Sequence, residues 1–384
     1  MHRTGAREHE PPCITKRGDA ARRRVNSVVP DAGFGKNPWY GLCSSPRMHR
    51  RTFLRTMGAT GAGLALGGGL LARAASPDHG RIAYQLGWVK NFQFAGDYIA
   101  DYRRYYQRFG VEVDLLSGGP TINVEPIIMS GKAMVGQSMP DLVANAVAKG
   151  ADLRIIAACY QRNVSAVISL AKTPLTKPAD MIGRRIGIQI NNLVIWHAFL
   201  RLNRIDPASL TTVPVQFDFT PLVSGEVDGF FGEVIDDAVQ LRGSGVDIHC
   251  MLFADFGYNM LTATYEVASD SLRDRAKRSQ IVAFMKGDLL GWRDAVRDPA
   301  FAARLTVDVY GKGNGLDAGR QEASCRVANE FIDAPVVRDH GLFWMSPAAV
   351  EETLASLSAA GVRASRDLFT NEILEEAFEG IGAG

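Results

Sequence analysis

The sequence has few cysteines, and they are not spaced for cross-linking or metal binding. Of five cysteines in 384 residues, Cys13 and Cys43 precede the mature chain expected below, which leaves Cys159, Cys250 and Cys325. Three widely separated thiols form neither a disulfide framework nor a set of metal ligands. We therefore expect neither disulfide bonds nor a metal site.

The sequence also lacks an apolar run long enough to cross a membrane. Its most apolar segment, 58–71, is rich in glycine and shorter than the roughly 20 residues that a membrane helix needs. The letters RRTFL from Arg50 precede this run, and the small-x-small pattern Ala72-Arg73-Ala74 follows it. This order is typical of a twin-arginine export signal, which we expect at 48–75. A membrane-anchoring helix is the alternative.

Residues 1–47 carry two adjacent prolines, a run of three arginines and no apolar periodicity. Because an export signal belongs at an N-terminus, we hypothesise that Met48 is the true start and that 1–47 is a mis-assigned, disordered leader. Detection of a peptide from 1–47 by proteomics would contradict this. No cysteine follows the apolar run to carry a lipid anchor, so we expect a soluble protein in the periplasm.

The chain after residue 75 also lacks an excess of basic residues. The net charge is only +2, but residues 1–75 hold thirteen Lys and Arg against four Asp and Glu, and the remainder holds 30 against 37. A nucleic-acid binder usually shows a basic domain. Here the basic part is the segment expected to be removed, so we expect no nucleic-acid partner.

Familiar catalytic motifs are absent as well. The sequence contains no G-x-S-x-G, no H-E-x-x-H and no phosphate-binding loop of the Walker type. These absences give no sign of the enzyme classes that carry such motifs, and we expect no cofactor. An exported cofactor-bound oxidoreductase stays open as an alternative, because the twin-arginine route often carries folded cofactor enzymes.

From Arg81 onward, short apolar strands alternate with helical patterns, which is typical of an α/β fold with mostly parallel sheets. We expect one helix at about 96–109, a capping box at Ser138 and Asp141, and a crossing segment at 172–185. Two stretches, 126–136 and 221–232, share the scheme of a helix, Ser-Gly and a strand. Two similar lobes would give this echo, and so would chance.

Six motifs in order carry a family resemblance across 81–300: GWVKNFQFAGDYIA, VEVDLLSGGP, SGKAMVGQS, ADMIGRRIGIQ, LVSGEVDGFF and GWRDAVRDP. The chain resembles the periplasmic substrate-binding proteins of ABC importers, in the thiamine-biosynthesis-like group that binds pyrimidine precursors, riboflavin, nitrate or alkanesulfonates. The resemblance implies a two-lobed type II fold with two crossing strands and a ligand cleft between the lobes. It places the first lobe at 81–170 plus 263–384 and the second at 171–262. It also implies a binder that works as a monomer, closes on its ligand and docks on the transmembrane permease subunits. A pyrimidine-synthase-like enzyme is the alternative, although the clustered cysteines of the fungal relatives that make the thiamine pyrimidine have no counterpart in the mature chain.

In open parallel sheets, ligands lie beyond the carboxyl ends of the strands. In the first lobe these ends carry the candidates Trp88, Asn91, Phe94, Gly119, Ser138, Asp141 and Tyr160. In the second lobe they carry Asn191, Asn192, Phe217, Glu233 and Asp237, and Tyr258 follows the last strand. The resemblance adds an aromatic clamp at Trp88.

Each candidate also has a purely structural interpretation. Phe94 is expected to pack, Asn91 can cap a turn, and the serine and paired asparagines can cap helices. Which acid among Glu233, Asp236 and Asp237 faces the cleft is left open. A rim of aromatics and acids with little Arg or Lys suits a heterocycle better than nitrate or a sulfonate. We rank the pyrimidine precursor of thiamine first and riboflavin second.

Overall fold

The computed structural model describes residues 79–216 and 218–382. The leader at 1–47, the export signal at 48–75 and the candidate Phe217 lie outside these residues. Within the described part of the chain, no helix is both long enough and apolar enough to cross a membrane.

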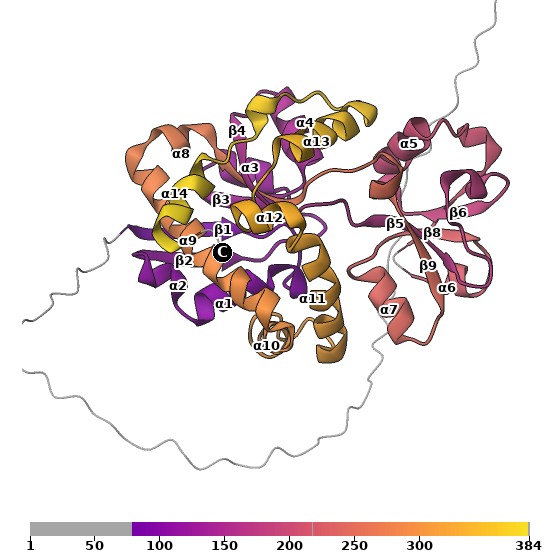
Figure 1. Ribbon diagram of the computed structural model, residues 1–384, viewed down its shortest axis with the longest axis horizontal. Coiled ribbons are helices and arrows are strands. Elements are labelled where there is room, and N and C mark those ends of the chain that lie inside the picture. The colour runs from indigo at the N-terminus through magenta and orange to yellow at the C-terminus, as the bar shows by residue number, and fades with distance from the viewer. Residues whose placement is uncertain (1–78, 217, 383–384) are drawn as a thin grey trace, which may run out of the picture. The chain divides into compact units, whose positions relative to one another are not determined.

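The first sheet has five strands in the order β2-β1-β3-β10-β4 (Figure 1). The strands are β1 Gly80–Gln85, β2 Val111–Leu116, β3 Val135–Ser138, β4 Leu153–Tyr160 and β10 Thr262–Ala268. β1 pairs in parallel with β2 and β3, whereas β10 is antiparallel to both of its neighbours. The carboxyl ends of β1, β2 and β3 therefore meet at one edge of the sheet.

The second sheet has the order β7-β6-β8-β5-β9. Its strands are β5 Ser165–Leu170, β6 Arg185–Ile188, β7 Thr211–Pro214, β8 Gly229–Glu233 and β9 Ile248–Leu252. β6 pairs in parallel with β7 and β8, and β5 is antiparallel to β8 and β9. The carboxyl ends of β6, β7 and β8 again share one edge.

The two sheets repeat one topology. In the first sheet β2, β1 and β3 are parallel, and the antiparallel strand β10 separates them from β4. In the second sheet β7, β6 and β8 are parallel, and the antiparallel strand β5 separates them from β9. The echo in the sequence maps onto α3 (Val124–Met129) with β3 and α6 (Thr220–Val223) with β8. It therefore reflects two similar lobes.

The chain passes between the sheets earlier than expected. β5, which was assigned to the first lobe, pairs with β8 and β9, so the lobe boundary falls between Tyr160 and Ser165. The proline-containing segment 172–185 follows β5 within the second lobe and is not the crossing. The return lies where it was expected, just before β10. The backbone N–H of Asn163 donates to Oδ1 of Asn259 (3.0 Å), which joins the two crossing segments.

The helix expected at 96–109 is divided into α1 (Ala95–Tyr102) and α2 (Tyr105–Arg108), because Arg104 takes a left-handed conformation with φ 58°. The other helices of the first lobe are α4 Pro140–Ala148, α8 Ser269–Arg273, α9 Arg275–Arg297, α10 Pro299–Leu305, α11 Ala318–Ile332, α12 Pro335–His340, α13 Pro347–Ala359 and α14 Glu372–Ile381. The second lobe has α5 (Leu193–Leu202) and α7 (Asp237–Gly243).

Helices α1 and α9 approach each other closely through glycine (Figure 1). A Cβ atom on Gly291 would lie 2.2 Å from the carbonyl oxygen of Gly96, and one on Gly96 would lie 2.1 Å from the Trp292 ring. No side chain fits at either position, so both glycines are required for this contact.

A pair of buried carboxyl groups lies beside this contact. Asp97 and Asp288 are both fully buried. Tyr265 donates its hydroxyl to both (3.3 and 2.8 Å), and Tyr106 also donates to Asp288 (2.7 Å). Burial, and after it the neighbouring Asp288 carboxyl, raises the pKa of Asp97. Two such groups without a cation are stable when they share a proton.

Candidate ligand-binding site

Trp88 lies just after β1 at the carboxyl edge of the first sheet, and 38% of its surface is exposed. The backbone N–H of Gly118 donates to the carbonyl of Trp88 (3.0 Å). A Cβ atom on Gly118 would lie 2.3 Å from the Leu86 carbonyl oxygen, so only glycine allows the two loops to meet. This contact holds an open indole ring at the strand ends.

Asn91 and Phe94 have local roles. Asn91 is buried, and its Oδ1 accepts the Gln93 backbone N–H (3.0 Å), which caps the short helix η1 (Phe92–Phe94). Phe94 is 1% exposed and packs against Tyr98. Phe94 therefore supports the loop from below and offers no surface to a ligand, which corrects its place among the candidates.

Ser138 is not a helix cap. Its hydroxyl donates to Oε1 of Glu125 (2.6 Å), and Met139 holds the N-cap position of α4 without a side-chain bond. The expected capping box was therefore wrong, because a partner distant in the sequence takes the hydroxyl. Asp141 lies half-buried in the first turn of α4, and its burial raises the pKa of its carboxyl.

Gly119 is buried and opens a turn, since its carbonyl accepts the backbone N–H of Ile122 (3.0 Å). Tyr160 ends β4, and Tyr258 lies in the return segment. Both rings are buried, and neither hydroxyl has a hydrogen-bond partner among the described residues. Burial, and then the charge of Asp141, raises the pKa of Tyr258.

Asn192 holds the N-cap position of α5 but makes no side-chain capping bond there. Asn191 is exposed, and Asn192 donates from Nδ2 to Oε1 of Gln189 (3.0 Å). Gln189 in turn donates to the carbonyl of Phe231 on β8 (3.1 Å), so this side chain ties two strand ends together. Between these amides, Ile190 is 83% exposed. Because Ile190 follows an apolar strand and has the side chain of a typical core residue, its exposure could not be predicted from the sequence.

The three acids of the second lobe lie around the end of β8, and Glu233 is the most perturbed. Burial raises the pKa of Glu233 to about 8, and the nearby Asp237 and then Asp236 add to the shift. Asp237 accepts the Glu233 backbone N–H through Oδ2 (2.8 Å), and burial raises its pKa to about 6. Glu233 is therefore a carboxyl group that keeps its proton at neutral pH.

Helix α11 brings two residues to this region that the sequence did not indicate. The guanidinium of Arg320 pairs with Asp236 (3.0 Å). Gln321 accepts the Phe92 backbone N–H through Oε1 (2.8 Å), which fixes α11 against the loop after β1. The helix is more than 80 residues from Glu233 in the sequence and shows an ordinary helical pattern, so no local signal identified it.

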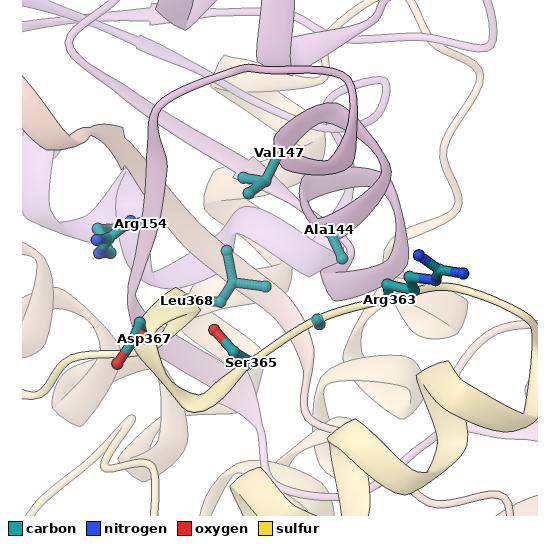
Figure 2. Close-up of a pocket in the computed structure, with 8 residues that line it drawn as sticks. Ala144, Val147, Arg154, Arg363, Ser365, Asp367 and Leu368 are labelled. Atoms are coloured by element: carbon teal, nitrogen blue, oxygen red, sulfur yellow. The ribbon is translucent and has the colours of Figure 1, made fainter.

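A small cavity lies away from these strand ends, beside α4 and the segment after α13 (Figure 2). Its lining includes Arg154, Arg363 and Leu368, and its volume is about 60 Å³. Pockets for small organic ligands are several times larger, about 300 Å³ or more. This cavity therefore does not hold a heterocycle.

The family model described as "NMT1/THI5 like" matches residues 91–302. Riboflavin-binding protein RibY of Chloroflexus aurantiacus is 25% identical over 320 residues, which are 78% of this chain and 88% of RibY.

Two solved structures extend the comparison. The aliphatic sulphonate binding protein SsuA of Escherichia coli is 14% identical with a TM-score of 0.53, over 74% of this chain and 86% of SsuA. The desulfurization enzyme DSZB is 14% identical with a TM-score of 0.53, over 79% of this chain and all of DSZB. At this identity the likeness concerns the fold, and the expected two-lobed binding-protein fold is confirmed.

Proposed function

We propose, since the chain belongs to the NMT1/THI5 like family, that it is the solute-binding component of an ABC importer and that its ligand is a flat nitrogen heterocycle. Riboflavin is our first candidate, because RibY is named for binding it and resembles this chain over most of both lengths. The pyrimidine precursor of thiamine, which we ranked first from the sequence, becomes the second candidate.

The observation that carries this proposal is the carboxyl of Glu233 at the end of β8, because burial, and then Asp237 and Asp236, raises its pKa to about 8. A carboxyl that keeps its proton offers one donor and one acceptor side by side. Riboflavin has a ring N–H between two carbonyl groups, and an aminopyrimidine has a ring nitrogen beside an amino group. Either edge can exchange two hydrogen bonds with Glu233, and neither ligand has to bring a charge.

Two apolar surfaces suit the faces of such a ring. Trp88 is open at the edge of the first sheet, and Ile190 is open at the corresponding edge of the second. A ring held between them would bury both when the lobes close, and aromatic stacking would add to the affinity. Closure around the ligand would then create the form that docks on the permease.

Anionic ligands fit these groups less well. Nitrate and sulfonates need convergent donors without nearby acids. The second lobe offers Glu233, Asp236 and Asp237, and the Arg320 guanidinium already pairs with Asp236. The likeness to SsuA concerns the fold and does not change this preference.

An enzyme is the alternative from a different class. Burial raises the pKa of Cys159, and it raises that of Cys325 to about 12, so both thiols stay protonated and are poor nucleophiles. In the described part of the chain, no group of three or more His, Cys, Asp or Glu side chains is arranged to hold a metal. Both observations favour a binder over a thiol- or metal-dependent enzyme.

The route of export is part of the same proposal. A solute-binding protein must reach the periplasm, and the twin-arginine pattern at Arg50 and Arg51 would direct it there. Replacing both arginines by lysine should leave the protein in the cytoplasm, as measured by cell fractionation. Unchanged export would contradict this route.

The ligand is tested first by native mass spectrometry of gently purified protein, which weighs any co-purified molecule. Riboflavin, the hydroxymethyl aminopyrimidine precursor and an alkanesulfonate are then compared by thermal shift. We expect riboflavin to raise the unfolding temperature, because a ligand that binds only the folded state stabilises it. A shift with the sulfonate alone, or with none of the three, would overturn the proposal.

A further inference from the structure

A group of polar atoms lies unpaired where β4 ends against helix α11. The Tyr160 hydroxyl, Oε1 of Gln161, Oγ of Ser324 and Nε of Arg320 are buried, and none has a hydrogen-bond partner within residues 79–216 and 218–382. The Tyr160, Gln161 and Ser324 side chains are at least 95% buried. Native proteins pair nearly all such atoms, so four of them on two elements that pack together point to a ligand.

One backbone hydrogen bond joins the end of β4 to helix α11. The N–H of Gln161 donates to the carbonyl of Phe331, which fixes the end of β4 against α11 (2.9 Å). Burial, and after it the neighbouring Cys159, raises the pKa of Tyr160, and Glu233 and then Cys325, which is next to Ser324 on that helix, add to the shift. Glu233 also lies opposite Ser165, just past the crossing segment that follows Tyr160.

The unpaired atoms of this group are suited to binding neutral hydroxyl groups of a ligand. Two of its members are hydroxyl groups, which donate and accept, one is an amide oxygen that accepts, and one is a guanidinium N–H that donates. The single positive charge, on Arg320, is paired with Asp236, and Glu233 and Asp237 lie beside that aspartate. A phosphate would therefore meet more carboxyl groups than free cations.

We propose that Tyr160, Gln161 and Ser324 form a subsite for the polyhydroxyl side chain of the ligand, and that the acids around Arg320 exclude its phosphorylated form. The inference rests on the proposed function, because it assigns the polar tail of a ligand whose ring lies at Trp88 and Glu233. It adds a basis for selecting riboflavin over flavins that lack the ribityl chain or carry a phosphate.

Three flavins test it by fluorescence titration of the full-length mature protein. Lumiflavin has the ring without the ribityl chain, and flavin mononucleotide adds a phosphate. We expect riboflavin to bind at least about tenfold more tightly than either, the ratio expected for one or two buried hydrogen bonds. Equal affinity for riboflavin and lumiflavin would overturn the subsite and leave the proposed function intact. Failure of all three to bind would overturn the subsite and the choice of riboflavin as first candidate.

Substitutions then locate the effect. Tyr160→Phe should reduce the preference for riboflavin over lumiflavin by about tenfold and leave lumiflavin affinity unchanged. Tyr84→Phe removes a buried tyrosine hydroxyl from β1 and should change neither affinity. If Tyr160→Phe loses affinity for riboflavin and lumiflavin equally, the hydroxyl has a structural role, and the subsite is contradicted.

The charge argument has its own variant. Asp236→Asn removes the carboxylate paired with Arg320 and frees the guanidinium. We expect affinity for flavin mononucleotide to rise by about tenfold relative to riboflavin. An unchanged ratio would show that the acids around Arg320 do not exclude the phosphate.

Discussion

Replacing Glu233 by glutamine tests whether a protonated carboxyl is the group that recognises the ligand. Burial, and then Asp237 and Asp236, raises the pKa of Glu233 from 4.5 to about 8. Glutamine keeps a donor and an acceptor at every pH. In the wild-type protein, riboflavin affinity should fall by about tenfold as pH rises from 7 to 9, because the ionised carboxylate cannot donate. In Glu233→Gln the affinity should stay constant over that range.

The same substitution should stabilise the ligand-free protein at alkaline pH. Between about pH 4.5 and pH 8 the unfolded chain releases this proton while the folded chain keeps it, so stability falls as pH rises and then levels off. A shift of 3.5 pKa units corresponds to about 5 kcal/mol. Because the side chain is still partly open to water, we expect about half of that, or roughly 2–3 kcal/mol, to be regained in Glu233→Gln at pH 8.

Urea unfolding and riboflavin titration at pH 5, 7 and 9 measure both effects. Glu226→Gln is the matched control, since it removes an exposed carboxyl group from the same lobe. We expect the control to behave as the wild-type protein does. If Glu233→Gln and the wild-type protein lose affinity in parallel between pH 7 and pH 9, the proton on Glu233 takes no part in recognition, and the argument from β8 fails.

Three further predictions concern the first lobe. Trp88→Ala should lower riboflavin affinity at least about tenfold by calorimetry, and unchanged affinity would remove this ring from the site. Asp97→Asn should lose less thermal stability than the wild-type protein between pH 5 and pH 8, because the raised pKa of Asp97 makes its ionisation destabilising; parallel curves would contradict a shared proton. Gly291→Ala should cost about 1–3 kcal/mol of unfolding free energy, since its Cβ meets the backbone of α1. Gly319→Ala, whose Cβ has room, is its control, and equal effects would refute the packing argument.

The strands could be predicted from the sequence because each is a short apolar run between turn residues. Their pairing could not. The run at 165–170 has the same composition whichever sheet it joins, and only its partners β8 and β9 place it in the second lobe. The break between α1 and α2 also escaped prediction. Arg104 adopts a positive φ without the glycine that usually marks such a position.

Some residues of the candidate site could likewise be predicted from the sequence, and others could not. Glu233 and Trp88 could be proposed as candidates because they follow strands directly, and strand ends in such sheets meet ligands. Ser138 could not be assigned correctly, since its hydroxyl bonds to Glu125 rather than to the adjacent helix. Arg320 could not be found at all, because its contact with Asp236 depends on how α11 packs against α7.

The repeated topology suggests how two similar lobes come to contribute different chemistry. β3 and β8 hold the same place in their sheets, and each leads into a helix whose first turn carries an acid, Asp141 or Asp237. At the strand end itself, the first lobe has Ser138 and the second has Glu233. The serine hydroxyl is taken up internally by Glu125, whereas no protein donor or acceptor is recorded for the Glu233 carboxyl among the described residues. We therefore infer that one exchange of side chain at equivalent positions leaves the first lobe to offer an apolar surface and the second to recognise the polar edge of the ligand.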